Sequence, residues 1–216
     1  MFEEIAEEIT RKFREIKLWL SNIDTEKAYA TIDMGLFFVY IYGVYEETVR
    51  KVVSNTILEL NNEHIPIDKC IFDLYSLIFS KEYDGIYNVG NDHKWEKRWD
   101  IAEKLRENLE VKLPNELFPT DGKNIRYRQL ESLAKSFGLK DNILPRTEVG
   151  GYIEEMVNNR NYIAHGNKLP REVGRGYTLE ELTLRCEIIS EVCNYIVERY
   201  SSYIVEKKFL KERVAN

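Results

Sequence analysis

Residues 32–45 read IDMGLFFVYIYGVY, and this stretch decides the fold. It is apolar on nearly every face, which is typical of a helix at the centre of a protein. The segment around it, residues 25–62, contains no proline and is too long for one strand, so it predicts a long central helix despite its β-branched and aromatic residues. Gly35 and Gly43 lie eight apart, so they are expected to share a face that another helix approaches closely.

Helices are predicted on both sides of this segment, from apolar residues at helical spacing and from residues that begin or end helices. Residues 3–20 form an amphipathic helix, and Asp24 or Thr25 is expected to cap the central helix. Thr178 and Glu181 form a capping box that begins a long last helix. The remaining predicted elements cover residues 67–79, 93–110, 124–137 and 147–164.

Local signals predict where helices stop and which faces they bury. Asn124 is expected to cap the helix that Gly138 ends. Residues 81–92 contain two glycines and several turn formers, and they predict a loop. Residues 111–123 contain two prolines and a glycine, and they predict an irregular connection. The helix over 93–110 carries an apolar stripe that predicts its buried side, formed by Trp95, Trp99, Ala102 and Leu105.

Together these elements predict an all-α fold, a bundle of six or seven helices in a single domain over residues 1–216. The core is expected over about residues 25–205, with residues 1–22 as an N-terminal amphipathic helix. The chain is 44% hydrophobic and 31% charged, which fits a globular protein with a sizeable core. No apolar run is long enough to span a bilayer, and the acidic N-terminus is unlike a secretory signal, so a cytoplasmic protein without a membrane span is expected.

Charge and cysteine usage narrow the function classes. The net charge of −6 argues against broad, sequence-independent coating of nucleic acid, although it leaves room for a local basic cleft. The three cysteines lack metal spacing and fit a reducing compartment, with Cys186 and Cys193 as small core residues. No histidines are paired at helical spacing, and the sequence has no glycine-rich phosphate loop or nucleophile motif, so neither a metal site nor a cofactor is expected.

Candidate chemistry is concentrated in residues 156–169, which read MVNNRNYIAHGNKL. Arg160, Asn161 and His165 lie here, and a glycine follows the histidine. The arginine–histidine spacing is weak by itself, because a chain with this many arginines would contain it by chance about as often as not. A plain helix end is an equally good physical account, with a glycine past the last turn and a histidine against the negative end of the helix dipole.

Three local features favour a site. Asn161 and His165 are four apart and share one helix face, with Arg160 beside them. The small Ala164 leaves room around the imidazole. Positive charges near the motif outnumber the negative charge of Glu172. They belong to Lys168, Arg171 and Arg175, joined by Arg126 and Arg128. A guanidinium, an imidazole and further cations suit a phosphodiester.

Glu46 and Glu47 follow the apolar stretch and allow two interpretations. The plain one is a solvated helix face with ion pairs to Arg50 and Lys51, four residues further on. The sharper one is that Glu46 enters the core side and orients a base from another helix.

The run RNYIAHG at 160–166 resembles the Arg–polar–x–x–x–His signature of the HEPN superfamily, with Asn161 in the polar position. VYIYGVYEETVRKVV (39–53) is similar to the long early helix of stand-alone prokaryotic members, and NIRYRQLESLAKSFGL (124–139) to the helix and glycine stop before the motif. The resemblance implies an all-α homodimer in which two motifs face each other. It also implies a metal-independent endoribonuclease, often a toxin or an effector of antiviral defence, so an antitoxin or defence partner is expected.

Under this resemblance Arg160, Asn161 and His165 are the catalytic residues, with Glu46 and Tyr162 in support and the nearby cations contacting RNA. His165 would act as general base or acid, Arg160 would stabilise charge on phosphorus, and Asn161 would orient His165 or the phosphate. One histidine cannot fill both proton-transfer roles in one step, so a second copy would supply the other. The products would carry 2′,3′-cyclic phosphate and 5′-hydroxyl ends. Two alternatives stay open: a nucleotide- or RNA-binding module without turnover, and a helical adaptor.

Overall fold

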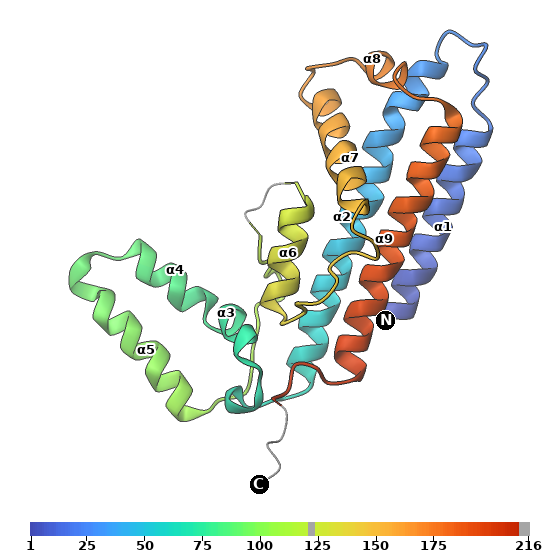
Figure 1. The fold of residues 1–216 in the computed structure, drawn as a ribbon. Helices are drawn as coiled ribbons and strands as arrows, with labels where there is room; N and C mark the ends of the chain where they lie inside the picture. The colour runs from blue at the N-terminus through green and yellow to red at the C-terminus, as the bar shows by residue number, and fades with distance from the viewer. Residues whose placement is uncertain (121–123, 212–216) are drawn as a thin grey trace.

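Residues 1–120 and 124–211, which the computed structural model describes, form nine α-helices and no strand (Figure 1). Two isolated β-bridges, Pro66 with Glu110 and Cys70 with Leu210, tie loops together. The all-α prediction is confirmed. Two short helices lie in this part of the chain beyond the elements predicted from sequence, one over residues 80–88 and one over residues 170–174.

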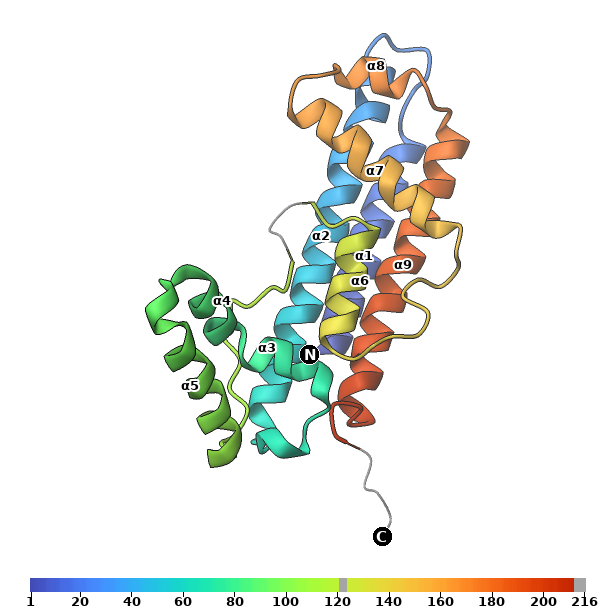
Figure 2. The ribbon, with the colours of Figure 1, turned by 60° about the vertical axis from the view of Figure 1, so that its left-hand side comes forward.

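Three long helices run side by side and enclose most of the core (Figures 1 and 2). They are α1 (Phe2–Ser21), α2 (Ala30–Asn62) and α9 (Leu179–Val205). The predicted apolar stripe of α1 is buried along its whole length, in the same core as α2 and α9. The predicted capping box begins α9, because the N–H of Glu181 donates to Thr178 Oγ1 at 3.2 Å and the N–H of Thr178 donates to Glu181 Oε2 at 2.8 Å.

The central helix begins later than predicted. Residues 24–29 form turns in which the N–H of Lys27 donates to the carbonyl of Asp24 at 3.0 Å and the N–H of Ala30 donates to the carbonyl of Lys27 at 3.0 Å. The Asp24 carboxylate accepts the N–H of Glu26, so it stabilises a local turn instead of the first turn of α2. Helix starts set by such local competition are the least certain part of a sequence-based assignment.

A pair of glycines allows a short helix to cross α2. An ideal Cβ at Gly35 would lie 1.9 Å from the carbonyl oxygen of Pro170 in α8 (Pro170–Gly174), and one at Gly174 would lie 2.0 Å from the carbonyl oxygen of Thr31. The two backbones therefore touch where no other residue type fits. A Cβ at Gly43 would meet nothing within 4 Å, so the predicted close approach is correct for Gly35 and wrong for Gly43.

Two further helices extend this layout: α7 (Val149–Ala164) packs on α2 and contacts α8, and α6 (Tyr127–Ser136) packs against α7 (Figure 2). Gly138 ends the α6 region in the left-handed conformation, as predicted. Residues 67–79 were predicted as one element, but they form two 3₁₀ turns, Ile67–Lys69 and Phe72–Leu74, and the short α3 (Tyr75–Ile78). This segment is held by distant backbone, since the N–H of Ile71 donates to the carbonyl of Phe209 at 2.9 Å.

Residues 80–107 form an arm that projects from the bundle in both views (Figures 1 and 2). It consists of α4 (Ser80–Asn88), where a loop was predicted, and α5 (Lys94–Glu107). Gly85 does not break α4, because the helix packs on α5 with Lys97 3.5 Å from the position of the missing Cβ. Neither helix contains a buried residue.

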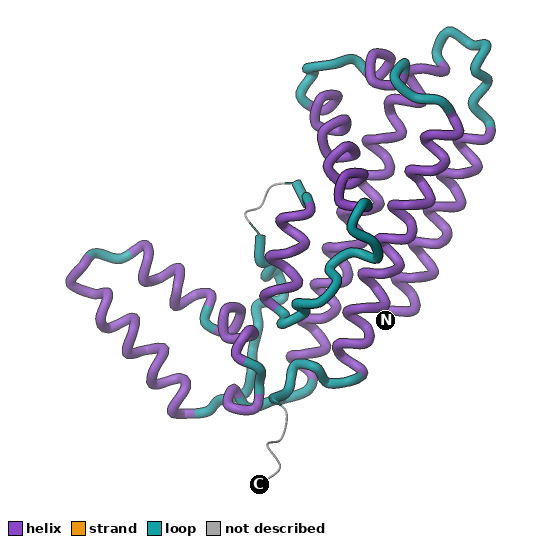
Figure 3. Tube along the Cα trace, viewed as in Figure 1, coloured by secondary structure: helices purple, strands orange, loops and turns teal. Residues whose placement is uncertain are grey.

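The prediction that one face of α5 is buried is wrong. Trp95 and Trp99 are each 60% exposed, and Ala102 and Leu105 are exposed as well. The helix turns its Lys97 side toward α4, and no other described element covers the opposite stripe. The connection over residues 108–120 is irregular, as predicted for residues 111–123, and residues 121–123 of that prediction lie outside the described residues (Figure 3).

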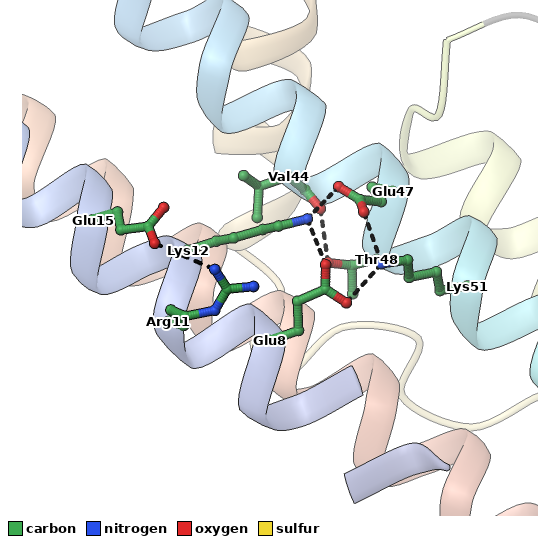
Figure 4. Close-up of polar contacts among 8 residues, drawn as sticks. All are labelled: Glu8, Arg11, Lys12, Glu15, Val44, Glu47, Thr48 and Lys51. Atoms are coloured by element: carbon green, nitrogen blue, oxygen red, sulfur yellow. Dashed lines mark hydrogen bonds and ion pairs between the residues drawn. The ribbon is translucent and has the colours of Figure 1, made fainter. Parts of the chain in front are cut away.

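A ring of alternating charges joins α1 to α2 (Figure 4). Lys12 pairs with Glu8 at 2.8 Å and with Glu47 at 2.5 Å, and Lys51 pairs with Glu8 at 2.6 Å and with Glu47 at 2.8 Å. These hydrogen bonds lower the pKa of Glu8 from 4.5 to about 2. The predicted i,i+4 pair between Glu47 and Lys51 is therefore present, as part of a contact between helices.

The cysteines fit the sequence expectation. Cys70, Cys186 and Cys193 are all buried free thiols, and Cys186 and Cys193 are core residues as predicted. None of the helices in the described ranges combines the length and apolar character that crossing a bilayer requires.

Candidate active site at the end of α7

The motif lies at the C-terminal end of α7, and a glycine ends the helix as predicted. Gly166 has φ of +70°, a conformation that glycine adopts at low cost. The N–H of His165 donates to the carbonyl of Asn161 at 3.0 Å, and beyond the helix end the N–H of Lys168 donates to the carbonyl of Tyr162 at 3.1 Å. The chain therefore leaves the helix directly after the histidine.

Arg160 is held from three directions. Its Nη1 donates to Asn161 Oδ1 at 3.0 Å and to Asn124 Oδ1 at 3.2 Å. Its guanidinium carbon lies 4.8 Å from the centroid of the Tyr42 ring, a cation–π contact. Tyr42 is itself fixed in the core of α2, where its hydroxyl accepts the N–H of Ile125 at 3.2 Å. The charge of Arg160 is thus oriented before any ligand arrives.

His165 is placed differently from Arg160. Its side chain is exposed, and within residues 1–120 and 124–211 its imidazole has no hydrogen bond or ion pair. Asn161 shares its helix face, but the amide oxygen of Asn161 binds Arg160. The structure therefore brings Arg160 and Asn161 together and leaves the imidazole free to meet a substrate or a partner.

Asn124 and Tyr42 are site residues that the sequence did not reveal. Asn124 was predicted to cap a helix, but α6 begins at Tyr127, with Arg126 in the N-cap position. The Asn124 side chain instead reaches Arg160, 36 positions along the chain. No local pattern carries such a contact, because it exists only after α2, α6 and α7 have packed together.

Glu46 forms the ion pair with Arg50 that the plain interpretation predicts. Its carboxylate pairs with Arg50 Nη2 at 3.0 Å. Burial raises the pKa of Tyr42, and the Glu46 carboxylate raises it further. Among the described residues it makes no contact with the His165 imidazole.

The remaining predicted residues form two groups. Close to the motif, Lys168 Nζ lies 4.7 Å from the ring centroid of the exposed Tyr162, and Arg171 and Arg175 are exposed without ion pairs in the described chain. Further along α7, Arg126 forms an ion pair with Glu154 and donates to Asn158 Oδ1 at 2.8 Å. Arg128, also exposed, lines a cavity at the opposite end of α7.

A polar cluster behind α7 fixes the helix against α9. Asn159 donates to the hydroxyl of Tyr177 at 2.7 Å, and that hydroxyl donates to Glu155 Oε1 at 3.0 Å. Arg185 of α9 completes the cluster through Nε and Glu155 Oε2 at 2.7 Å. The motif is therefore anchored at a defined position at the end of a rigid element.

Comparison with known proteins agrees with this architecture. A sequence model of the RiboL-PSP-HEPN family matches residues 7–202, from α1 to near the end of α9. Neither the comparison with curated proteins nor the comparison with solved structures gives a match. The part of the chain that the structure describes has no group of three or more His, Cys, Asp or Glu side chains placed to hold a metal ion. The family match covers nearly the whole chain, and the chain belongs to the RiboL-PSP-HEPN family of the HEPN superfamily.

Proposed function

We propose that the protein is a metal-independent endoribonuclease that leaves 2′,3′-cyclic phosphate and 5′-hydroxyl ends. Membership of the family suggests a ribonuclease-type or nucleotide-binding function. One observation carries the finer proposal. A guanidinium fixed by Tyr42, Asn124 and Asn161 and the exposed imidazole of His165 both come from the C-terminal end of α7.

The reaction needs a base, an acid and a cation. The ribose 2′-oxygen attacks the adjacent phosphorus, and the bond from phosphorus to O5′ breaks. A base takes the proton of the 2′-hydroxyl, and an acid gives a proton to O5′. An imidazole can fill either role near neutral pH, which assigns this step to His165. Since the nucleophile belongs to the substrate, the mechanism requires no metal-bound water.

Arg160 stabilises the charge that builds up on the phosphoryl oxygens. A cation oriented in advance stabilises a transition state without the cost of reorganising at the moment of reaction. Asn161 positions Arg160 through the 3.0 Å hydrogen bond. The sequence instead predicts that Asn161 orients His165 or the phosphate. The planar fork of arginine suits two phosphate oxygens at once.

A second copy of the chain supplies the second imidazole. The exposed side of α2 supports this arrangement, because Ile32, Leu36 and Val39 are exposed there and nothing described lies within 4 Å of a Cβ at Gly43. These residues share one apolar stripe that the described chain leaves uncovered.

The test is RNA cleavage in excess chelator, with the product ends identified by mass spectrometry. The wild type is expected to cleave RNA. In Arg160→Ala and in His165→Ala the cleavage rate is expected to fall about a hundredfold or more. His64→Ala is the matched control, because His64 is an exposed histidine paired with Glu110 far from the motif. Loss of cleavage when the chelator removes metal ions, or full activity of His165→Ala, would contradict the mechanism.

A binding module without turnover is the second candidate, and one observation favours it. No described side chain orients the His165 imidazole, whereas a catalytic histidine usually has a partner that fixes it. This candidate predicts that RNA protects the motif while no product forms. Cleavage that depends on His165 would exclude it.

We further propose a role as a toxin or defence effector in the cytoplasm, restrained by an antitoxin or a defence partner. Expression of the wild type should then arrest growth, and expression of His165→Ala should not. A helical adaptor is the remaining candidate, and the uncovered stripe of the arm is the feature that favours it. Equal growth with both forms, with no cleavage of RNA, would support the adaptor.

A further inference from the structure

One face of α7 joins the motif to the far end of the helix. Gly150, Glu154, Asn158, Asn161 and His165 follow one another at spacings of four, four, three and four, so they lie on one stripe. None of the five is buried. A ligand that reaches His165 can therefore continue along the same face toward the start of α7.

The segment that leads into α6 runs beside this stripe and supplies one cation to it, Arg126. Asn124 meets Arg160, Arg126 pairs with Glu154, and the N–H of Tyr127 donates to Glu154 Oε1 at 3.3 Å. The carboxylate in the middle of the stripe is thus neutralised by Arg126. An anion passing along this face does not meet an unpaired negative charge there.

A cavity of about 710 Å³ lies at the far end of the stripe, between α6, α7 and residues 140–147. Gly150 and Gly151 form part of its wall without side chains, and a Cβ at Gly151 would meet nothing within 4 Å. Tyr127, Ile143 and Leu144 give it an apolar side. This combination offers a flat surface for a base and room for the sugar beside it.

The cations of the cavity differ in how far they are committed to other partners. Lys140 pairs with Asp73 at 2.9 Å, and Arg146 pairs with Glu191 and Glu148. Arg128 is exposed at the cavity and has no ion pair in the described part of the chain. Its guanidinium is therefore the group most readily available to a phosphate.

We propose that this cavity is a second RNA-binding site, which takes a nucleotide flanking the cleaved bond, with the base against Tyr127 and a phosphate at Arg128. The inference rests on the proposed function. Gly151 and Arg160 are nine residues apart, a rise of roughly 14 Å along α7. A dinucleotide has one phosphodiester and cannot place a phosphate at both ends of this path, whereas an octanucleotide can.

The experiment measures binding of labelled RNA by fluorescence anisotropy in the His165→Ala background, in excess chelator. Adding Arg128→Gln is expected to weaken octanucleotide binding about tenfold and to lower the salt dependence by about 0.7 in slope, the loss of one phosphate contact on a single strand. Dinucleotide binding should not change. Lys135→Gln is the matched control, since it removes an exposed cation from the same helix outside the cavity.

Equal octanucleotide binding with and without Arg128→Gln overturns the second site, whatever the cleavage assay shows. Adenosine monophosphate that binds through Arg128 without competition from the octanucleotide also overturns it, because the ligand would then be a free nucleotide. If the wild type does not cleave RNA but octanucleotide binding still depends on Arg128, the nuclease proposal fails and the cavity stands as a binding site for RNA that is not cleaved.

Discussion

The bundle and the arm contain helices with the same kind of sequence pattern and opposite outcomes. Leu182, Cys186 and Ile189 of α9 form an apolar stripe that is at most 1% exposed, because α1 and α2 cover it. Trp95 and Trp99 of α5 also recur at helical spacing, and each is 60% exposed. An apolar stripe therefore predicts that a helix has a face to bury, but it does not say which element will cover it.

The same contrast appears inside the candidate site. Arg160 is surrounded by groups from α2, α7 and the segment before α6, whereas the imidazole of His165, at the same helix end, has no hydrogen bond or ion pair with any described residue. A side chain that its own chain holds is already oriented before a ligand binds. The His165 imidazole has no such partner, and we infer that RNA or another copy of the chain orients it on binding.

The largest expected effect is on the free energy of unfolding, and it differs between the bundle and the arm. Phe37→Ala removes a fully buried ring of α2 and is expected to cost about 3–5 kcal/mol of unfolding free energy. Trp99→Ala in the arm should cost less than about 0.5 kcal/mol, because its ring is already exposed to water. Urea unfolding followed by circular dichroism measures both. A cost for Trp99→Ala that rises with protein concentration would break the comparison, since it would mean that a second copy buries the stripe.

Two glycines of α2 sharpen the comparison within one helix. Gly35→Ala places a methyl group 1.9 Å from the Pro170 carbonyl and is expected to destabilise the protein by about 1–3 kcal/mol as α8 is displaced. Gly43→Ala should stabilise it by about 0.5–1 kcal/mol, because the site is open and alanine favours helix. Thermal unfolding of the two variants side by side is the measurement. Equal effects would contradict the close crossing of α8 over α2.

Sequence reasoning succeeded where the signal is local. The capping box at Thr178 and the glycine ends at Gly138 and Gly166 depend on a few neighbouring residues, and the structure contains all three. It failed where the outcome depends on distant partners. The helix over residues 80–88 and the exposure of Trp95 follow from which segments pack together. Asn124 belongs here too, because its contact with Arg160 spans 36 positions.

Asn124→Ala tests whether fixing Arg160 matters, provided that the proposed cleavage is measured. Removal of one hydrogen bond to a guanidinium should lower kcat about tenfold with little change in KM, since Asn124 orients Arg160 and not the substrate. Asn167→Ala serves as the control, because Asn167 is exposed beyond the helix end and should leave the rate unchanged. If kcat of Asn124→Ala equals that of the wild type, the contacts with Tyr42 and Asn161 are sufficient by themselves.

The smallest expected effect concerns the charge ring between α1 and α2. Hydrogen bonds from Lys12 and Lys51 lower the pKa of Glu8 from 4.5 to about 2, so this carboxylate stabilises the folded state above pH 4.5. That contribution is lost as the pH falls from 4.5 toward 2, where Glu8 becomes protonated in the folded protein as well. Glu8→Gln should therefore destabilise the protein near neutral pH, by less than about 1 kcal/mol because the ring is partly solvated. Its deficit relative to the wild type should shrink over that acidic range. Glu15→Gln removes a more exposed pair with Arg11 on the same helix and should have no measurable effect near neutral pH. A deficit for Glu8→Gln that stays constant from pH 5 to pH 2 would show that lost packing, not charge, is responsible.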